Sequence, residues 1–205
     1  MNSDELEEVL FVITDIEDAN LTIRFEDDRD LLYRLDVGLY PWSEGHSINI
    51  EDKGYVTDVT LRGNGRIRSV DLVLGTGLFY KLHITPGVGS MLNTIVTYDN
   101  GALLYYHKSD FQYVASGSLT FNFKENASFV GTHFDADIQC DDLELNIDLP
   151  VDTQGCVTFG PAILTFESHG WMYKGIGYFG TCTPIRTPYL NLQITADTAR
   201  AFLRN

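Results

Sequence analysis

Apolar and polar residues alternate with a two-residue period along most of this chain. Leu119, Phe121 and Phe123 alternate with polar residues, and the same pattern recurs from Leu143 to Leu149. Successive side chains of a β-strand point to opposite faces, so this period is typical of strands with one buried and one wet face. The pattern predicts an all-β fold with two sets of residues: Phe121, Phe134, Ile138, Leu145 and Ile147 buried, and Asn122, Asp135, Asp137, Glu144 and Asn146 exposed.

Turn-forming dipeptides separate these runs and predict hairpins in series. A two-residue turn at Asn100-Gly101 would pair Tyr98 with Leu103, and a turn at Asn64-Gly65 would set Val59 against Val70 and Asp58 against Asp71. No helices of 10 to 15 residues alternate with the strands, which argues against a parallel α/β fold. We therefore expect a mainly antiparallel sandwich, or a strongly curved sheet closing toward a barrel.

Short helices are expected at both ends of the chain. Between Asp4 and Ile16, apolar residues recur at three- and four-residue steps, which favours an amphipathic helix. A strand from Val9 to Thr14 is the alternative, because four of its residues are β-branched. Near the C-terminus, Thr195 can cap a helix that extends to Arg204.

Length and charge restrict the class of protein. The 205 residues fit one domain, and no change in composition divides them, so we expect a single β-rich domain over residues 1–205. Lys and Arg number 14 against 29 Asp and Glu, which gives a net charge of −15 and argues against nucleic-acid binding. The apolar runs are shorter than the roughly 18 residues of a membrane span, and the acidic N-terminus is unlike a signal peptide. We expect a soluble protein; the sequence does not identify its compartment.

No motif predicts catalysis, a metal or a cofactor. His133, Asp135 and Asp137 could ligate a metal from one strand face, but a solvated face explains them as well. Glu167, near His169, is the carboxylate that a hydrolase mechanism would most simply use, although 29 acidic residues make chance pairs common. The chain has three cysteines, Cys140, Cys156 and Cys182, which are too few for a disulfide framework. We expect them to be buried thiols; the alternative is that two of them form one disulfide bridge.

Two features suggest a binding surface. Aromatic residues stand among glycines in one segment, where core packing is the competing explanation, and they give four candidate ligand-binding residues: Trp171, Tyr173, Tyr178 and Phe179. The first 30 residues contain 11 acidic residues against two arginines, which predicts an acidic face. We therefore expect a non-catalytic binding or interaction protein, with a protein partner or a small apolar ligand. The alternatives are a structural or assembly component of a larger particle and a hydrolase with paired carboxylates.

Overall fold

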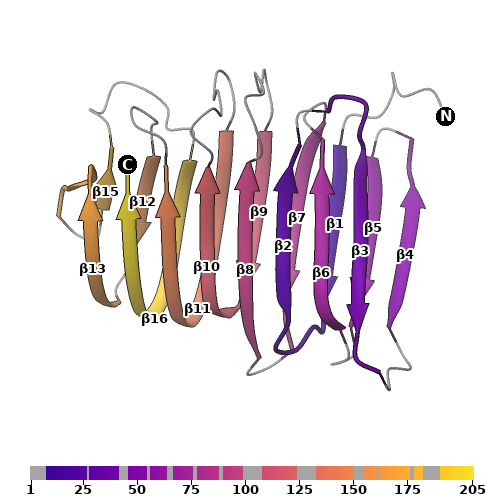
Figure 1. Ribbon diagram of the computed structural model, residues 1–205, viewed down its shortest axis with the longest axis horizontal. Helices are drawn as coiled ribbons and strands as arrows, with labels where there is room; N and C mark the ends of the chain where they lie inside the picture. Colours follow the sequence, from indigo (N-terminus) through magenta and orange to yellow (C-terminus); the bar gives the residue numbers. More distant parts are fainter. Residues whose placement is uncertain are drawn as a thin grey trace.

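The computed structural model describes residues 8–26, 28–41, 46–54, 56–63, 67–75, 78–87, 90–98, 108–123, 133–149, 155–160, 162–175, 178–181 and 190–205. These residues form strands and no helix, and all the strands belong to one 16-stranded sheet. The sheet folds over on itself into two facing layers (Figure 1). The expected all-β fold is confirmed, and a strongly curved sheet is its form.

We name the layers front and rear, as they appear in Figure 1. In spatial order, the front layer contains β3 (Tyr33–Leu39), β6 (Ile67–Leu74), β2 (Asn20–Phe25), β8 (Met91–Tyr98), β10 (Ser116–Phe123), the C-terminal parts of β11 (His133–Asp148) and β16 (Leu190–Arg204), and β13 (Ile163–His169). The rear layer contains β4 (Ser47–Asp52), β5 (Val56–Arg62), β1 (Glu8–Thr14), β7 (Phe79–Thr85), β9 (Lys108–Val114), the N-terminal parts of β11 and β16, β12 (Gly155–Phe159), β15 (Tyr178–Gly180) and β14 (Met172–Tyr173).

Neighbouring strands are mostly parallel, so the expected mainly antiparallel arrangement is wrong. Among the described pairings, only β3 with β6, β4 with β5, β12 with β15 and β14 with β15 are antiparallel. The chain runs down in the rear layer, turns at the lower end and runs up in the front layer (Figure 1). We call each such unit a pass. Because every pass repeats the same direction, neighbouring passes align in parallel within each layer.

The turn signals in the sequence connect layers rather than neighbouring strands. β5 and β6 flank Asn64-Gly65 but belong to different layers, and Val59 pairs with Phe11 and Ile50 instead of Val70. The predicted hairpin there is therefore wrong. The hairpin predicted at Asn100-Gly101 falls on residues 99–107, outside the described part of the chain.

Strands occupy both segments expected to be helical. β1 covers residues 8–14, with Val9, Phe11 and Ile13 buried, so the alternative strand is the correct interpretation there; residues 1–7 lie outside the description. β16 runs through Thr195 to Arg204, and its full pairing with β11 outweighs the helix-capping signals.

Two long strands pass through both layers without interruption. In β11, Ile138 is buried in the rear half, Asp141 and Asp142 are both exposed, and Leu143 is buried in the front half. Two consecutive outward residues shift the alternation by one position, so the strand keeps its apolar face inward as it changes layer. In β16, Asp197 and Thr198 occupy the equivalent corner.

The spatial order of the passes differs from their order in the sequence. The second pass, β5 and β6, lies outside the first, β1 and β2, so the first is enclosed between the second and the third, β7 and β8. The last strand, β16, is likewise inserted between β11 and the pass formed by β12 and β13.

One apolar core lies between the layers. Of the residues predicted to be buried, Phe121, Ile138, Leu145 and Ile147 are buried. Of those predicted to be exposed, Asn122, Asp137 and Glu144 are exposed and Asn146 is half-buried. The side chains of Phe134 and Asp135 lie outside the description.

A buried hydrogen bond joins the two layers inside this core. The hydroxyls of Thr94, on β8, and Tyr113, on β9, are 2.9 Å apart, and both side chains are fully buried. Burial raises the pKa of Tyr113 well above its usual range, since no water can solvate a phenolate there.

We expect Tyr113→Phe to lower the free energy of unfolding by about 1 to 3 kcal/mol, because it leaves the buried Thr94 hydroxyl without this partner. Adding Thr94→Val should then cost less than it does in the wild-type protein, because the unmatched hydroxyl disappears. Urea unfolding of the four proteins measures this coupling, and strictly additive losses would contradict it.

Candidate functional site

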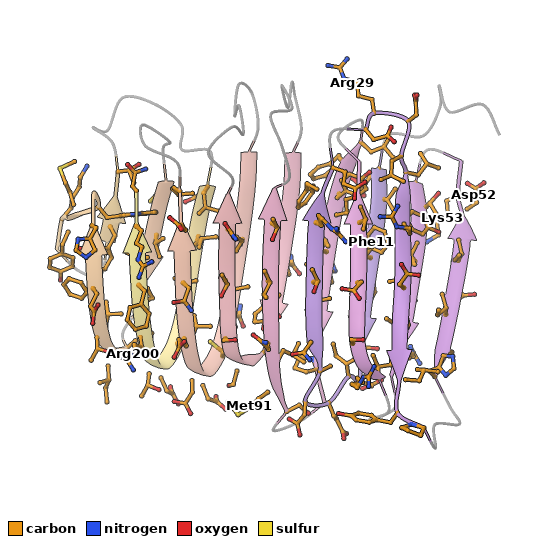
Figure 2. All side chains as sticks on the ribbon, in the orientation of Figure 1. Phe11, Arg29, Asp52, Lys53, Met91 and Arg200 are labelled. Atoms are coloured by element: carbon orange, nitrogen blue, oxygen red, sulfur yellow. The ribbon has the colours of Figure 1, made fainter. Side chains whose placement is uncertain are left out.

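A groove on the outer face of the front layer is the best-formed candidate site. Its volume is about 660 Å³, and it crosses the lower end of the layer from β2 and β8 to β13. Figure 2 shows two of its residues, Met91 and Arg200, at this lower end. We call it the front-face groove.

Strand register aligns polar side chains across this groove. Successive Cα partners from β2 to β13 form one transverse row, which we call the polar row: Asn20, Asn93, Ser118, Glu144, Arg200 and Thr165. Parallel pairing without a shift places these residues at equivalent heights on six neighbouring strands, although they are far apart in the sequence. The row combines amides, hydroxyls, a carboxylate and a guanidinium group.

Hydrogen bonds order one half of the polar row. The Ser118 hydroxyl donates to Asn93 Oδ1, and Asn93 Nδ2 donates to Asn20 Oδ1 at 3.2 Å. Below the row, the Thr198 hydroxyl donates to Asp142, and the Met91 amide donates to Asp18 Oδ1 at 3.1 Å. These bonds hold the polar lining in place before any ligand arrives, which reduces the entropy lost on binding.

Arg200 lies in the other half of the polar row. Its guanidinium carbon lies 4.8 Å from the ring centroid of Phe202, two residues along the same outer face, which is a cation–π distance. Among the ion pairs between described residues, none joins Arg200 to the neighbouring Glu144. Both side chains are exposed, so both charges face a ligand in the groove.

Exposed apolar residues lie at the two sides of the groove. Met91, on β8, is 57% exposed, and Ile163, on β13, is 73% exposed. Four strand-to-strand steps separate them, or about 19 Å at ~4.8 Å per step. The groove therefore offers an exposed apolar contact near each side, two residues before the polar row, and this combination of apolar and polar contacts is typical of binding sites.

The carboxylates do not form a desolvated catalytic pair in the described part of the chain. Asp18, Asp142 and Glu144 line the groove, and all three are exposed. Glu167 and His169 are also exposed, on β13. A hydrolytic acid of the glycosidase type needs an apolar setting that keeps it protonated.

The three aromatic candidates whose side chains are described, Trp171, Tyr173 and Phe179, do not form one surface. Trp171 and Phe179 pack in the core with exposed fractions of 6% and 0%, whereas Tyr173 is 53% exposed. The rings of Tyr173 and Phe179 are 5.0 Å apart, and the side chain of Tyr178 lies outside the description. Of these three side chains, only that of Tyr173, at the edge of the sheet, is exposed enough to contact a ligand directly.

A glycine explains the burial of Trp171. A Cβ atom at Gly155 would lie 2.6 Å from Cη2 of the indole ring, so only glycine allows Trp171 to pack against this backbone. The indole nitrogen Nε1 has no hydrogen-bond partner among the described residues.

The acidic residues of the N-terminal segment are divided between opposite ends of β2. Asp15 and Asp18 lie in the turn before it, whereas Glu26 and Asp28 follow it, and Glu8 pairs with Lys81 at 2.9 Å on the rear layer. Residues 1–7 and 27, which carry further acidic residues, lie outside the description. In the part of the chain that is described, no group of three His, Cys, Asp or Glu residues is placed to hold a metal; the side chains of His133 and Asp135 are outside it.

The described cysteines are free thiols. Cys156 is buried and Cys140 half-buried, and Cys182 lies outside the description. Burial, and then the negative charges of Asp141, Asp142 and Asp197, raises the pKa of Cys140 to about 11. Cys140 borders a second hollow, of about 450 Å³, on the outer side of the corner between the layers.

Sequence reasoning missed the polar row. Each of its residues is an ordinary outward position of its own strand, and only the register between strands brings the six together. Most residues of the polar row lie shortly after a corner at which the chain enters the front layer. In β11 the sequence does mark this corner, because the consecutive polar residues Asp141 and Asp142 interrupt the alternation.

Comparison with known proteins supports the fold. No protein-family model and no curated protein matches this sequence. The fold is similar to that of a crystal structure described as a putative cell adhesion protein from Clostridium sporogenes ATCC 15579, with a TM-score of 0.66 and 9% sequence identity. The match covers 100% of this chain and 96% of that one. At this identity the likeness shows a shared architecture.

The described residues contain no helix that is long and apolar enough to span a bilayer.

Burial of Trp171 predicts its fluorescence. In a Trp42→Phe variant, the remaining emission should be blue-shifted and only weakly quenched by iodide, because Trp171 is 6% exposed. Adding Gly155→Ala should red-shift the emission and increase quenching, since the new methyl group displaces the indole. Strong quenching before that substitution would contradict the packing described here.

The raised pKa of Cys140 predicts slow alkylation. In a variant with Cys156→Ser and Cys182→Ser, iodoacetamide should react at pH 8 about 100-fold more slowly than with a thiol of pKa 9, because the thiolate fraction falls tenfold per pKa unit. The rate should rise with pH toward a midpoint near 11. A midpoint near 9 would show that neither burial nor the three aspartates acts on this thiol.

Proposed function

We propose that this chain is a non-catalytic interaction protein that binds an extended segment of a protein partner in the front-face groove. The observation that carries the proposal is the polar row beside two exposed apolar residues, Met91 and Ile163, which precede it by two residues on β8 and on β13. The similarity in fold to a protein described as a putative adhesion protein agrees with such a role.

The dimensions of the groove suit a short peptide. An extended chain advances about 3.3 Å per residue, so about six residues span the distance of roughly 19 Å between the two apolar contacts. An apolar side chain at each end of the segment would cover Met91 and Ile163, and its backbone amides and carbonyls would bond to the polar row. This combination of apolar anchors and neighbouring polar contacts is common in peptide recognition.

The charge of the groove restricts the partner. Asp18, Asp142 and Glu144 outweigh Arg200 along the lining, and the whole chain carries −15. A neutral or basic segment is therefore favoured, and nucleic acid is disfavoured because its phosphates would meet these carboxylates. Complementary charge should also make the association weaker at high salt.

Other functions have less support from the geometry. A small apolar ligand would contact Met91 or Ile163 but would leave the polar row without partners. A hydrolase would need a protonated carboxyl group, whereas the carboxylates of the groove are exposed to water. Tyr173 and its aromatic neighbours lie at the edge of the sheet and remain a secondary contact surface for a partner.

A peptide library displayed on phage tests the proposal. Selected peptides should carry two apolar residues about six positions apart, and the synthetic peptides should bind the wild-type protein when measured by calorimetry. Met91→Asp and Ile163→Asp should each weaken binding at least about tenfold, because a charge then replaces an apolar contact. The expected loss corresponds to about 1.4 kcal/mol or more.

Ile95→Asp provides a matched control. Ile95 lies on the same outer face and is 38% exposed, but it does not line the groove. This variant should bind the selected peptides within about twofold of the wild-type affinity. Peptides that tolerate both groove substitutions, or that respond equally to Ile95→Asp, would place the binding surface elsewhere and overturn the proposal.

A further inference from the structure

Both ends of the folded sheet finish in strands with an open edge. Among the described strands, β3 and β4 end the front and rear layers at one end, and β13 and β14 end them at the other, each hydrogen-bonded on one side alone. We call these the β3/β4 end and the β13/β14 end; they lie at opposite ends of the long axis in Figure 1. An open edge presents backbone N–H and C=O groups that another strand can pair with.

Apolar side chains are uncovered at both ends. All six residues of β4 are exposed, and Ile48 and Ile50 on its core-facing side are 47% and 57% exposed. At the other end, Phe166 is 44% exposed and Tyr173 is 53% exposed. The core between the layers therefore reaches the surface at each end, and its outermost apolar side chains are exposed to solvent there.

Strand direction makes the two ends complementary. In the front layer, β6 and every strand from it to β13 are parallel, whereas β3 is antiparallel to β6, so β3 and β13 run in opposite directions. In the rear layer, β4 and β14 are opposed in the same way. A second copy displaced along the long axis therefore presents an antiparallel partner to both open edges. β3 and β13 also match in length, at seven residues each.

Charge favours contact between unlike ends. Residues 26–39 and 47–53 carry six carboxylates against three cations within the described positions, and Figure 2 shows Arg29, Asp52 and Lys53 at this end. At the other end, residues 162–175 and 190–205 carry two carboxylates, Glu167 and Asp197, against three cations, Lys174, Arg200 and Arg204. Two β3/β4 ends repel each other, whereas a β3/β4 end attracts a β13/β14 end.

We propose that copies of this protein associate head to tail, with β3 and β4 of one copy pairing with β13 and β14 of the next. Both layers and the core between them then continue across the joint. Because the operation is a displacement and not a two-fold rotation, the contact does not close, and each added copy offers a new open end. The joint adjoins the front-face groove at β13, which carries Ile163, but the proposal does not rest on peptide binding there.

Sedimentation velocity of variants blocked at one end tests the proposal. Ile50→Lys places a charge in the β3/β4 end, and Phe166→Lys does the same in the β13/β14 end. The wild-type protein should show an average mass that rises beyond a dimer between about 5 and 200 μM, whereas each variant alone should stay monomeric. An equimolar mixture of the two should form dimers and stop there, because each variant supplies the end that the other lacks.

Ile95→Lys, the same substitution at an exposed isoleucine away from both ends, should associate like the wild type. Tyr173→Lys replaces Phe166→Lys if circular dichroism shows that the latter is unfolded. A wild-type protein that is monomeric throughout the range overturns the proposal. So does a single blocked variant that still dimerises, because that result indicates contact between like ends.

Discussion

The fold depends on keeping one apolar face inward while the chain turns from the rear layer into the front layer. In β11 and β16 this turn happens inside a continuous strand, where strict alternation would carry apolar residues to the outside. Two consecutive outward residues, Asp141 and Asp142 in β11, reset the alternation at the corner. This shift in the alternation determines which residues of β11 after the corner fill the core and which form the outer face of the front layer.

The binding surface proposed for this protein follows from the same geometry. Parallel passes stack without a shift in register, so equivalent outward positions of different passes form straight rows across the sheet. Asn20 and Thr165 are far apart in the sequence and lie in one row for this reason. A surface of this kind can vary strand by strand while the core behind it stays the same, which suits a protein whose fold is shared at very low sequence identity.

The sequence predicted the strands well and their partners poorly. Alternation is a local property, and it correctly separated buried Phe121 and Leu145 from exposed Asn122 and Glu144. Pairing is a long-range property, and a tight turn has the same residues whether it joins neighbours or layers, so Asn64-Gly65 suggested a hairpin that does not exist. The terminal helix failed because pairing along β16 outweighs local propensity. The burial of Trp171 could not be predicted for a similar reason, since it depends on a contact with Gly155, sixteen residues earlier.

The insertion of β16 between β11 and the pass of β12 and β13 has a consequence for synthesis. β16 follows β11, β12 and β13 in the sequence and lies between them in the sheet, so the edges of these three strands stay unpaired until β16 has been synthesised. Contacts of such long sequence separation form slowly. A nascent chain that lacks β16 would expose these edges near the β13/β14 end of the sheet, where a chaperone, or a neighbouring nascent chain, would meet them first.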